Sequence, residues 1–375
     1  MNEAAAKPQS GAEVAEISSG TPLPRALAGS GLRRGAYRGM ETVAAFGGAE
    51  AELRAARCGA VVHDLGWRRR VAVAGEDRMR WLSGMVTNHV AGLGDGEGNF
   101  NLVLNAQGRI QGDCRVWRTG AGPELELEVD ENQREALLGH LERFIIMDDV
   151  ELRPVTGWTA LGVTGPEAGR VLQGALQADA QAMQPGGLLA SALRGPDAAT
   201  AVEVRRETGR QSGHWSVWCR EADAAAVWQT LETAGAQPVG CETVERLRIV
   251  EGMPAFGVDF AGDTLPQETA LDEALHFAKG CYLGQEIVER IHSRGQVHRH
   301  VRALEIFPDG QEPAVGMELS RADAPEKPVA KLTSVTSVEM DGARRWFALG
   351  MVKAEAETGA GELQYAGGRA WRITG

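Results

Sequence analysis

The chain has 375 residues, of which 43% are hydrophobic and 24% are charged, an ordinary composition for a soluble globular protein of two or three domains. Its formal net charge of −12 argues against a general nucleic-acid-binding protein and against a protein that binds anionic membranes. No apolar run reaches the roughly 20 residues that cross a bilayer, and the N-terminus lacks the basic-then-apolar order of a secretion signal. We therefore expect neither nucleic acid nor membrane among the partners.

The cysteines are widely spaced, odd in number and without a Cys-x-x-Cys pair. We therefore expect no disulfide framework and no self-contained cysteine site for zinc or an iron–sulfur cluster. This usage suits a reducing compartment and predicts a cytoplasmic protein. The five are Cys58, Cys114, Cys219, Cys241 and Cys281.

The chain begins with a segment, residues 1–36, that is rich in Ala, Gly, Pro and Ser and predicts a flexible tail. A first α+β domain is expected over residues 37–155, because strand-like apolar runs alternate there with stretches of helical period. Its predicted strands cover residues 71–74, 100–104, 110–117 and 125–129, and its predicted helices cover residues 76–86 and 131–146.

A second α+β domain is expected over residues 156–240, and residues from about 241 to 300 are expected to complete the first. The predicted strands are 158–163, 201–206 and 214–219, with a helix after Pro166, a loop at about 184–200, and helices at 221–234 and 242–250. From residue 301 onward, short strands and glycine turns without helices are typical of a small β-barrel or sandwich. The sequence contains no repeat with a period of about 20 to 50 residues.

The most informative segment is Lys279-Gly-Cys-Tyr-Leu-Gly-Gln-Glu286. Residues 283–292 are amphipathic at helical period, which places Cys281 at or near the start of a helix. Unpaired N–H groups, the helix dipole and the charge of Lys279 favour thiolate over thiol there, as in reactive or metal-ligating cysteines. The alternative is a small buried hydrophobic side chain, the usual environment of a free cysteine. The flanking glycines and charged residues favour the functional interpretation.

Two histidines, His298 and His300, alternate across Arg299 and would share one face of a strand. Together with Cys281 or His292 they could hold a metal ion. Because no further ligand stands at a recognised spacing, we interpret them as ordinary strand residues and predict no metal site.

The segment 279–286 resembles the signature of the YgfZ family, folate-binding proteins that support the assembly or repair of iron–sulfur clusters. That family is similar in fold to the glycine-cleavage T-protein, a tetrahydrofolate-dependent aminomethyltransferase. The resemblance implies a T-protein-like, three-lobed α+β architecture, in which two α+β units and a small C-terminal β-barrel (residues 301–375) surround a central folate cavity. Four other stretches resemble the superfamily in consistent order: Trp81–Asn88, Leu104–Ile110, Leu247–Gly257 and Leu265–Glu268.

Two departures from the T-proteins bear on the chemistry. T-proteins carry paired aspartates after the glycine turn, and here the corresponding positions read Gly112-Asp113. They also carry a Thr-Gly-Glu-x-Gly stretch whose glutamate anchors the pterin, whereas Thr208 to His214 contains no glutamate. An aminomethyl transferase needs a carboxylate near the reacting amine. Aminomethyl transfer is therefore disfavoured, although Asp113 keeps it open.

The resemblance also implies which residues form the site. The catalytic residues implied are Cys281 and Lys279, and the folate-binding residues implied are Trp67, Asn88, Asp113, Gln285, Glu286 and Arg294. Four of the folate-binding residues have a structural alternative: Trp67 is as readily a core residue, and Asn88 a cap of a helix or turn. Glu286 can pair with Arg290 one helical turn later, and Arg294 can be a solvated arginine beside a turn.

The function implied is that of a tetrahydrofolate-binding accessory factor for iron–sulfur proteins, with tetrahydrofolate or a one-carbon derivative as the cofactor. Its partners would be client iron–sulfur enzymes, for example of the radical-SAM type. One cysteine cannot hold a cluster that usually needs four ligands, so a contact through Cys281 would be shared with the client. The alternative is a folate-dependent aminomethyltransferase of the T-protein type, and whether the protein is an enzyme is left open.

Overall fold

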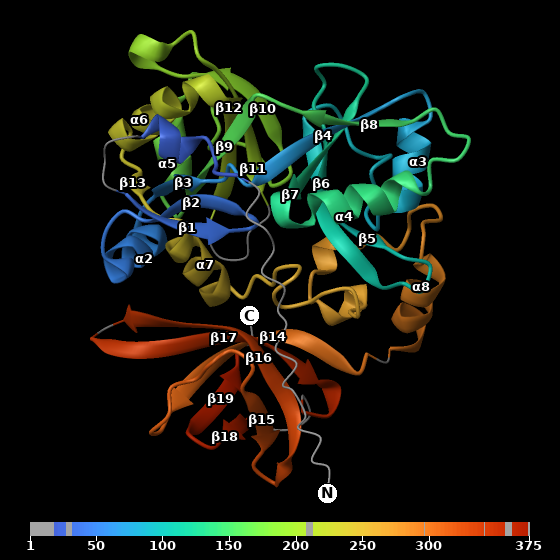
Figure 1. Ribbon diagram of the computed structural model, residues 1–375, viewed down its shortest axis with the longest axis vertical. Coiled ribbons are helices and arrows are strands. Elements are labelled where there is room, and N and C mark those ends of the chain that lie inside the picture. The colour runs from blue at the N-terminus through green and yellow to red at the C-terminus, as the bar shows by residue number, and fades with distance from the viewer. Residues whose placement is uncertain are drawn as a thin grey trace, which may run out of the picture.

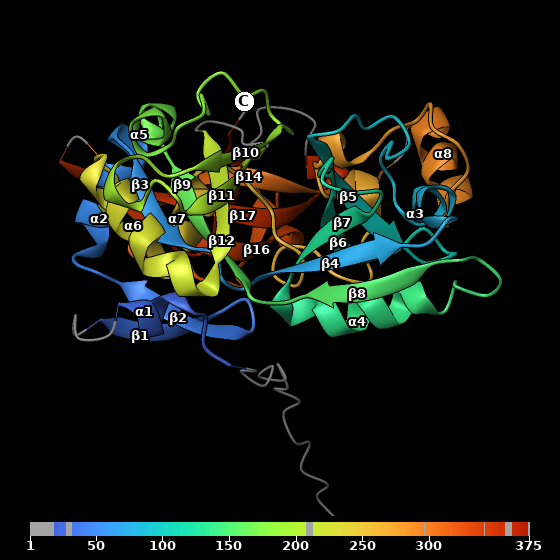
Figure 2. The same ribbon diagram turned by 90° about the horizontal axis from the view of Figure 1, so that it is seen from above.

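The computed structural model describes residues 19–27, 32–207, 213–295, 297–340, 342–356 and 362–373. Two α+β units lie side by side and a closed β-barrel lies below them, as Figures 1 and 2 show. This is the three-lobed α+β architecture that the sequence predicts. No helix in the described ranges is long and apolar enough to cross a membrane.

The first unit is a five-stranded antiparallel sheet in the order β5-β6-β7-β4-β8, with helices α3 and α4 packed on one face. The strands bury alternate residues against these helices, for example Leu125, Leu127 and Val129 of β7. The elements are β4 (Arg68–Ala74), α3 (Arg78–Met85), β5 (Glu97–Leu104), β6 (Ile110–Arg118), β7 (Leu125–Asp130), α4 (Glu131–Glu142) and β8 (Glu151–Val155).

The second unit is a six-stranded sheet in the order β10-β11-β12-β9-β3-β13, covered by α5 and α6. Strand β10 lies within the segment that the sequence predicts to be a loop, so that prediction is wrong there. The elements are β3 (Val61–Asp64), β9 (Trp158–Thr164), α5 (Ala168–Ala175), β10 (Leu188–Ala192), β11 (Ala201–Glu207), β12 (His214–Arg220), α6 (Ala224–Thr233) and β13 (Gln237–Pro238).

The two units are structural duplicates. Helix α5 begins and ends 90 positions after α3, and the glycine turns before them are likewise 90 positions apart. Equivalent residues also meet: the Leu188 amide donates to the Gly96 carbonyl at 2.7 Å, and the Gly98 amide donates to the Gly186 carbonyl at 2.8 Å. Because each bond is repeated with the roles exchanged, a local two-fold axis relates the units.

The N-terminal region is ordered earlier than the sequence suggests. The elements here are α1 (Leu23–Ala26), β1 (Arg33–Tyr37), β2 (Met40–Ala45) and α2 (Ala49–Cys58). Thr21 and Leu23 are fully buried, and the Thr21 and Thr42 hydroxyls both donate to the Asp64 carboxylate. The prediction of a flexible tail is therefore wrong for residues 19–27 and 32–36, while residues 1–18 lie outside the described residues. Strand β3 also belongs to the second sheet and not to the first domain.

The third lobe is a closed barrel in the order β14-β17-β16-β15-β18-β19. Helix α7 packs against it and against β2, and the segment between α7 and β14 carries α8 beside the first unit (Figure 1). The elements are α7 (Cys241–Val250), α8 (Gln285–Arg294), β14 (Arg299–Pro308), β15 (Glu318–Arg321), β16 (Ala324–Met340), β17 (Ala343–Lys353), β18 (Glu362–Tyr365) and β19 (Gly368–Arg372). Short 3₁₀ turns cover Gly195–Asp197, Glu221–Asp223, Pro266–Glu268, Asp272–Ala274 and Ala354–Ala356.

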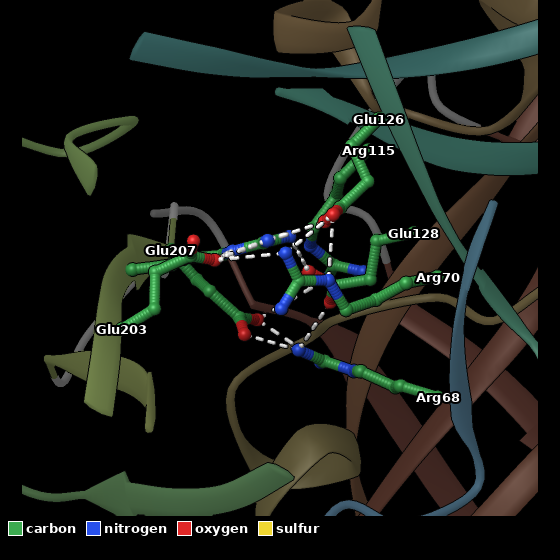
Figure 3. A network of polar contacts seen from close by, with 8 residues as sticks. Arg68, Arg70, Arg115, Glu126, Glu128, Glu203 and Glu207 are labelled. Atoms are coloured by element: carbon green, nitrogen blue, oxygen red, sulfur yellow. Dashed lines mark hydrogen bonds and ion pairs between the residues drawn. The ribbon is translucent and has the colours of Figure 1, made fainter. Parts of the chain in front are cut away.

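A layer of charged side chains joins the two sheets. On β7 the residues between the apolar ones are Glu126 and Glu128, and both point toward the second sheet, where Arg205 of β11 binds them (Figure 3). Arg205 is completely buried, and its guanidinium also lies over the rings of Trp117 and Trp218 at 5.0 and 5.2 Å. The complete charged layer comprises Arg68, Arg70, Arg115, Glu126, Glu128, Glu203, Arg205 and Glu207.

The charged layer contains four arginines and four glutamates, so its formal charges cancel. Pairs recur across strands: Arg68 binds Glu128 at 3.0 Å, and the Arg70 Nε donates to Glu126 at 2.6 Å. Burying a charge is costly unless partners satisfy it. The two sheets therefore fit together in one relative position, the one in which every carboxylate of the layer has an arginine.

Removing one charge from this layer should strongly destabilise the protein. We expect Arg205→Met to lower the free energy of unfolding by about 3–5 kcal/mol, because it leaves Glu126 and Glu128 short of a buried partner. Urea unfolding followed by circular dichroism measures the change. Arg170→Met, which removes the exposed ion pair with Glu167, is the control and should change little. A small effect of Arg205→Met would contradict the importance of the charged layer.

Candidate functional site

A cavity of about 410 Å³ lies where the two α+β units, the β1–β2 hairpin and α7 meet. Five aromatic side chains contribute to its wall, and charged groups of both signs stand between them. This combination suits a flat, polar ligand, which needs ring faces together with a few oriented hydrogen-bonding groups. The aromatic and titratable lining residues are Tyr37, Arg38, His63, Trp67, Arg68, Phe100, Asp113, Arg115, Asp130, Glu207, His214, Trp215, Arg248, Phe256 and Glu273.

Trp67 belongs both to the wall of the cavity and to a hydrophobic core cluster. It is only 3% exposed, packs with Met40 and Leu65, and meets the Tyr37 ring edge-on at a centroid distance of 4.8 Å. Both interpretations that the sequence left open for Trp67 therefore describe its position. Whether it contacts folate stays a prediction.

The charged layer extends into the cavity. Glu207, at the end of β11, binds Arg68 at 3.0 Å and Arg115 at 3.3 Å, and all three line the cavity. Burial alone would raise the pKa of Glu207, but the attraction of the two guanidinium groups outweighs it and holds the pKa well below its ordinary range. This wall is therefore a fixed ion-pair cluster in which Glu207 remains ionised at neutral pH.

A hydrogen-bonded chain of polar side chains forms another part of the wall. His63 Nε2 lies 3.1 Å from the Thr164 hydroxyl, which lies 3.4 Å from His214 Nδ1, and His214 Nε2 lies 2.9 Å from the buried Glu251. Burial lowers the pKa of His63 to about 4, so its imidazole is neutral under ordinary conditions. His63 therefore contributes a neutral hydrogen-bonding group.

Asp113 of β6, which the family resemblance implies as a folate-binding residue, also lines the cavity. The side chain of Gln133, on α4, donates to the Asp113 carboxyl at 2.8 Å and accepts the Asp113 backbone amide at 3.0 Å. Burial, followed by the charge of Asp130, raises the pKa of Asp113, against the opposing effects of Gln133, Arg115 and Arg38. The position suits proton exchange with a bound ligand, and the role itself is untested.

Lys279 lies away from the cavity wall. Its ammonium group donates to the carbonyl oxygens of Ser83 at 2.5 Å and Val86 at 2.6 Å, at the end of α3. It therefore satisfies carbonyl groups that a helix end leaves free. Burial lowers the pKa of Lys279 to about 8. Its amine is thus committed to α3, and the predicted action on Cys281 stays a prediction.

Cys281 is exposed, and the helix that follows it begins later than predicted, at Gln285. The thiol therefore precedes the helix by a full turn and does not occupy its first turn. The next residue, Tyr282, is buried between the first unit and the barrel. The cysteine thus stands on the surface, on a short segment that its neighbour anchors, and it is not among the residues that line the cavity.

Gly284 makes this local structure possible. It has a φ of 81°, in the left-handed region that glycine favours, and a Cβ there would lie 2.6 Å from the Asn105 carbonyl oxygen. The Asn105–Gly108 turn is thereby seated directly on the start of α8. The stretches Leu104–Ile110 and 279–286, which both carry the family resemblance, therefore contact each other in the fold.

The remaining predicted residues are used locally. The Asn88 side chain donates to the backbone carbonyl groups of Phe100 in β5 at 2.9 Å and of Glu273 at 2.7 Å, a structural use that differs from the predicted cap. Glu286 is exposed and pairs with Arg290 at 3.0 Å, as in its alternative. The other two stand at the two ends of α8: Gln285 accepts the Tyr282 amide at 3.3 Å, and Arg294 is the last helical residue. The roles of these residues in folate binding are untested, and Asn88, Gln285 and Glu286 are not among the cavity-lining residues.

Sequence reasoning missed several cavity residues, notably Arg38, Asp130, Glu207 and His214. Glu207 stands immediately before the stretch that was searched for a pterin-anchoring glutamate, so extending the search by one residue would have found it. Arg248 lies within the Leu247–Gly257 stretch and was likewise not singled out. Within the described ranges, no group of three or more His, Cys, Asp or Glu side chains is placed to hold a metal ion.

Known proteins share this architecture. The glycine cleavage system aminomethyltransferase T from Bartonella henselae superposes with a TM-score of 0.81 at 18% identity, covering 96% of this chain and 97% of that one. Aminomethyltransferases of Rubrobacter xylanophilus and Geobacillus kaustophilus are 31% and 27% identical, over 73% and 78% of this chain and 73% and 84% of their own length. The sequence model of the GCVT N-terminal domain matches residues 25–279.

The fold is therefore that of the glycine-cleavage T-proteins, with the cavity between the lobes. The chain belongs to the family defined by the GCVT N-terminal domain. The two curated relatives carry the aminomethyltransferase name, and the narrower YgfZ-type assignment stays a prediction.

Glycine at position 284 should be essential for the fold around Cys281. We expect Gly284→Ala to lower the free energy of unfolding by about 1–3 kcal/mol, since alanine is strained at this φ and its Cβ meets the Asn105 carbonyl. Thermal unfolding followed by calorimetry measures it. The matched control is Gly280→Ala in the same segment, where a Cβ meets nothing within 4 Å and which should be neutral. Equal stability of the two variants would contradict this account.

Proposed function

We propose that this protein is a tetrahydrofolate-binding accessory factor in the assembly or repair of iron–sulfur proteins, acting in the cytoplasm. Folate or a one-carbon derivative occupies the central cavity, and Cys281 acts on a client iron–sulfur enzyme. The observation that carries the folate part is the cavity itself, which combines aromatic faces with charged anchors in a fold shared with the T-proteins.

The chemistry of the cavity supports a folate. The pterin is a flat ring with amide-like donors and acceptors, and the aromatic walls formed by Trp67, Phe100 and Phe256 can pack against its faces. Asp113 offers a carboxyl for its polar edge. The glutamate tail is anionic and is attracted by the arginines of the wall, of which Arg38 is placed at the β1–β2 turn.

The position of Cys281 supports a role toward another protein. An exposed thiol on a short anchored segment is accessible to a macromolecule, whereas a thiol inside the cavity would meet only the small ligand. The cysteine cannot supply the four ligands of a usual cluster, so the client must provide the others.

The second candidate is a folate-dependent aminomethyltransferase of the T-protein type. Two observations favour it: the curated relatives bear this name, and Asp113 places a carboxyl in the cavity where an amine would react. The aminomethyltransferase candidate ranks second because the sequence lacks the second aspartate beside Asp113.

Folate binding is directly measurable. Isothermal titration calorimetry with tetrahydrofolate should show one folate bound per chain, and Trp67→Phe should weaken it about tenfold through lost ring contact. The matched control is Trp371→Phe in the barrel, where the indole packs edge-on against Phe307. Equal affinity of both variants and wild type would remove Trp67 from the site, and no binding by the wild type would overturn the folate proposal.

The two functions make different demands on Cys281. In cells lacking the protein, we expect Cys281→Ser to bind folate normally but to restore less than about a tenth of the activity of cluster-dependent enzymes, because a serine hydroxyl does not replace a cysteine sulfur as nucleophile or metal ligand. Cys58→Ser, at the other exposed cysteine, is the control and should restore activity fully.

Full rescue by Cys281→Ser would refute the functional thiol. A separate assay tests the rival: robust formation of methylene-tetrahydrofolate from an aminomethyl donor by the wild-type protein would reverse the ranking.

A further inference from the structure

We propose that Asp130 is the second acidic group of the cavity and a positioning residue that sets the protonation of Asp113, so that Asp113 exchanges a proton with a nitrogen of the bound ligand. The identity of that ligand as a folate rests on the proposed function above. The sequence lacks a second aspartate beside Asp113, and the structure supplies one from the neighbouring strand.

The first sheet carries the two carboxyl groups on neighbouring strands. Strands β6 and β7 are antiparallel and pair as far as Arg115 and Glu128. Asp113 and Asp130 each lie two residues beyond this pair on their own strand, so both are on the same face of the sheet as the pair. There the Gln133 side chain accepts the Asp113 amide. Both side chains line the same cavity.

The start of α4 leaves the Asp130 carboxylate free to face the cavity. Asp130 is the N-cap residue of α4, a position where aspartate ordinarily accepts a hydrogen bond from the helix, yet its side chain makes no capping bond. Backbone carbonyl groups satisfy those amides in its place: Trp67 accepts from Glu131 at 2.9 Å, and Arg38 accepts from Asn132 at 3.1 Å.

Arg38, whose carbonyl group accepts the Asn132 amide, has an uncommon backbone conformation. Its φ is 50°, which is rare for a residue other than glycine, asparagine or aspartate. Arg38 and Gly39 form the two-residue turn between β1 and β2, and this turn also places the Arg38 Nε 3.9 Å from the Asp130 carboxylate. Backbone strain of this kind accumulates at functional sites. One residue thus caps the helix and provides the counter-charge for Asp130.

The groups that face Asp113 come from four elements. Asp130 lies on β7, Arg115 lies two residues after Asp113 on β6, Gln133 donates from α4, and Arg38 approaches from the β1–β2 turn. Burial raises the pKa of Asp113, and the negative charge of Asp130 raises it further. When Asp113 gives its proton to a nitrogen of the ligand, that nitrogen gains one positive charge beside two carboxylates. No other bond forms or breaks, and the reverse transfer restores the neutral carboxyl.

The pH dependence of ligand binding tests this pairing. Because the neutral Asp113 carboxyl is the donor, tetrahydrofolate affinity should fall as pH rises through the pKa of Asp113. Asp130→Asn removes the like charge, lowers that pKa, and should make binding roughly fivefold weaker than wild type within the affected range. Asp113→Asn keeps an acceptor for Gln133 but cannot ionise, so its affinity should no longer fall there.

The control is Glu135→Gln, which removes the same charge from an exposed position on α4 and should give the wild-type curve. An Asp130→Asn curve that superimposes on the wild type would overturn the proposal. Absence of folate binding in every variant would instead refute the proposed function.

A ligand-free double-mutant cycle then decides the pairing. Because the pKa of Asp113 is raised in the folded protein, the wild-type protein loses stability as the pH rises through that pKa. Asp113→Asn avoids this loss, so the variant should be more stable relative to wild type at pH 7 than it is at pH 3. We expect this stabilisation by Asp113→Asn to be smaller in the Asp130→Asn background. The double-mutant cycle should therefore give an interaction free energy between the two positions at pH 7 and none at pH 3. An equal coupling at both values would contradict the electrostatic role.

Discussion

The charged layer between the two α+β units is the interaction on which the rest of the structure depends. Apolar surfaces tolerate sliding, whereas buried guanidinium and carboxylate groups are satisfied only when each meets its partner. The layer therefore fixes the two sheets in one relative position. Because Arg68, Arg115 and Glu207 continue from the layer into the cavity, the same contacts that join the units also shape one wall of the cavity.

Much of the fold follows from local periodicity. The strand at residues 110–117 and the helix at 242–250 are predicted within one residue, because the apolar residues of each recur with the period of its own secondary structure. Strand β10 is hidden in a segment rich in glycine, proline and alanine and becomes a strand only by pairing with β11. Residues 19–27 are held by long-range contacts, among them the Thr21 bond to Asp64 and the burial of Leu23 in the core of the second unit, which no local pattern reveals. The duplication escapes a search for short repeats because its offset is longer and its sequence has diverged.

The site is less predictable than the fold, for a physical reason. Glu126 and Glu128 alternate with leucines, a pattern that indicates a solvent-facing side of a sheet, and only the arginines of a distant strand make that side internal. Asp113 and Trp67 were found through the family resemblance. Arg38 and Asp130 were not, because their roles arise from a turn docking on a helix start. Cys281 is exposed, which contradicts the alternative of a small buried side chain, while its helix begins later than the pattern indicated and its role stays a prediction.

The local two-fold symmetry of the two units is broken at the cavity. A symmetric scaffold ordinarily offers two equivalent clefts, as a homodimer does. Here the β1–β2 hairpin docks at the start of α4, and in the described ranges the equivalent helix α6 is instead preceded by a short 3₁₀ turn. The residues that gather around Asp130 therefore occur on one side of the axis alone. One half carries Asp113 and Asp130 and the other carries Glu207 and His214, so the two halves contribute unlike groups to the same cavity.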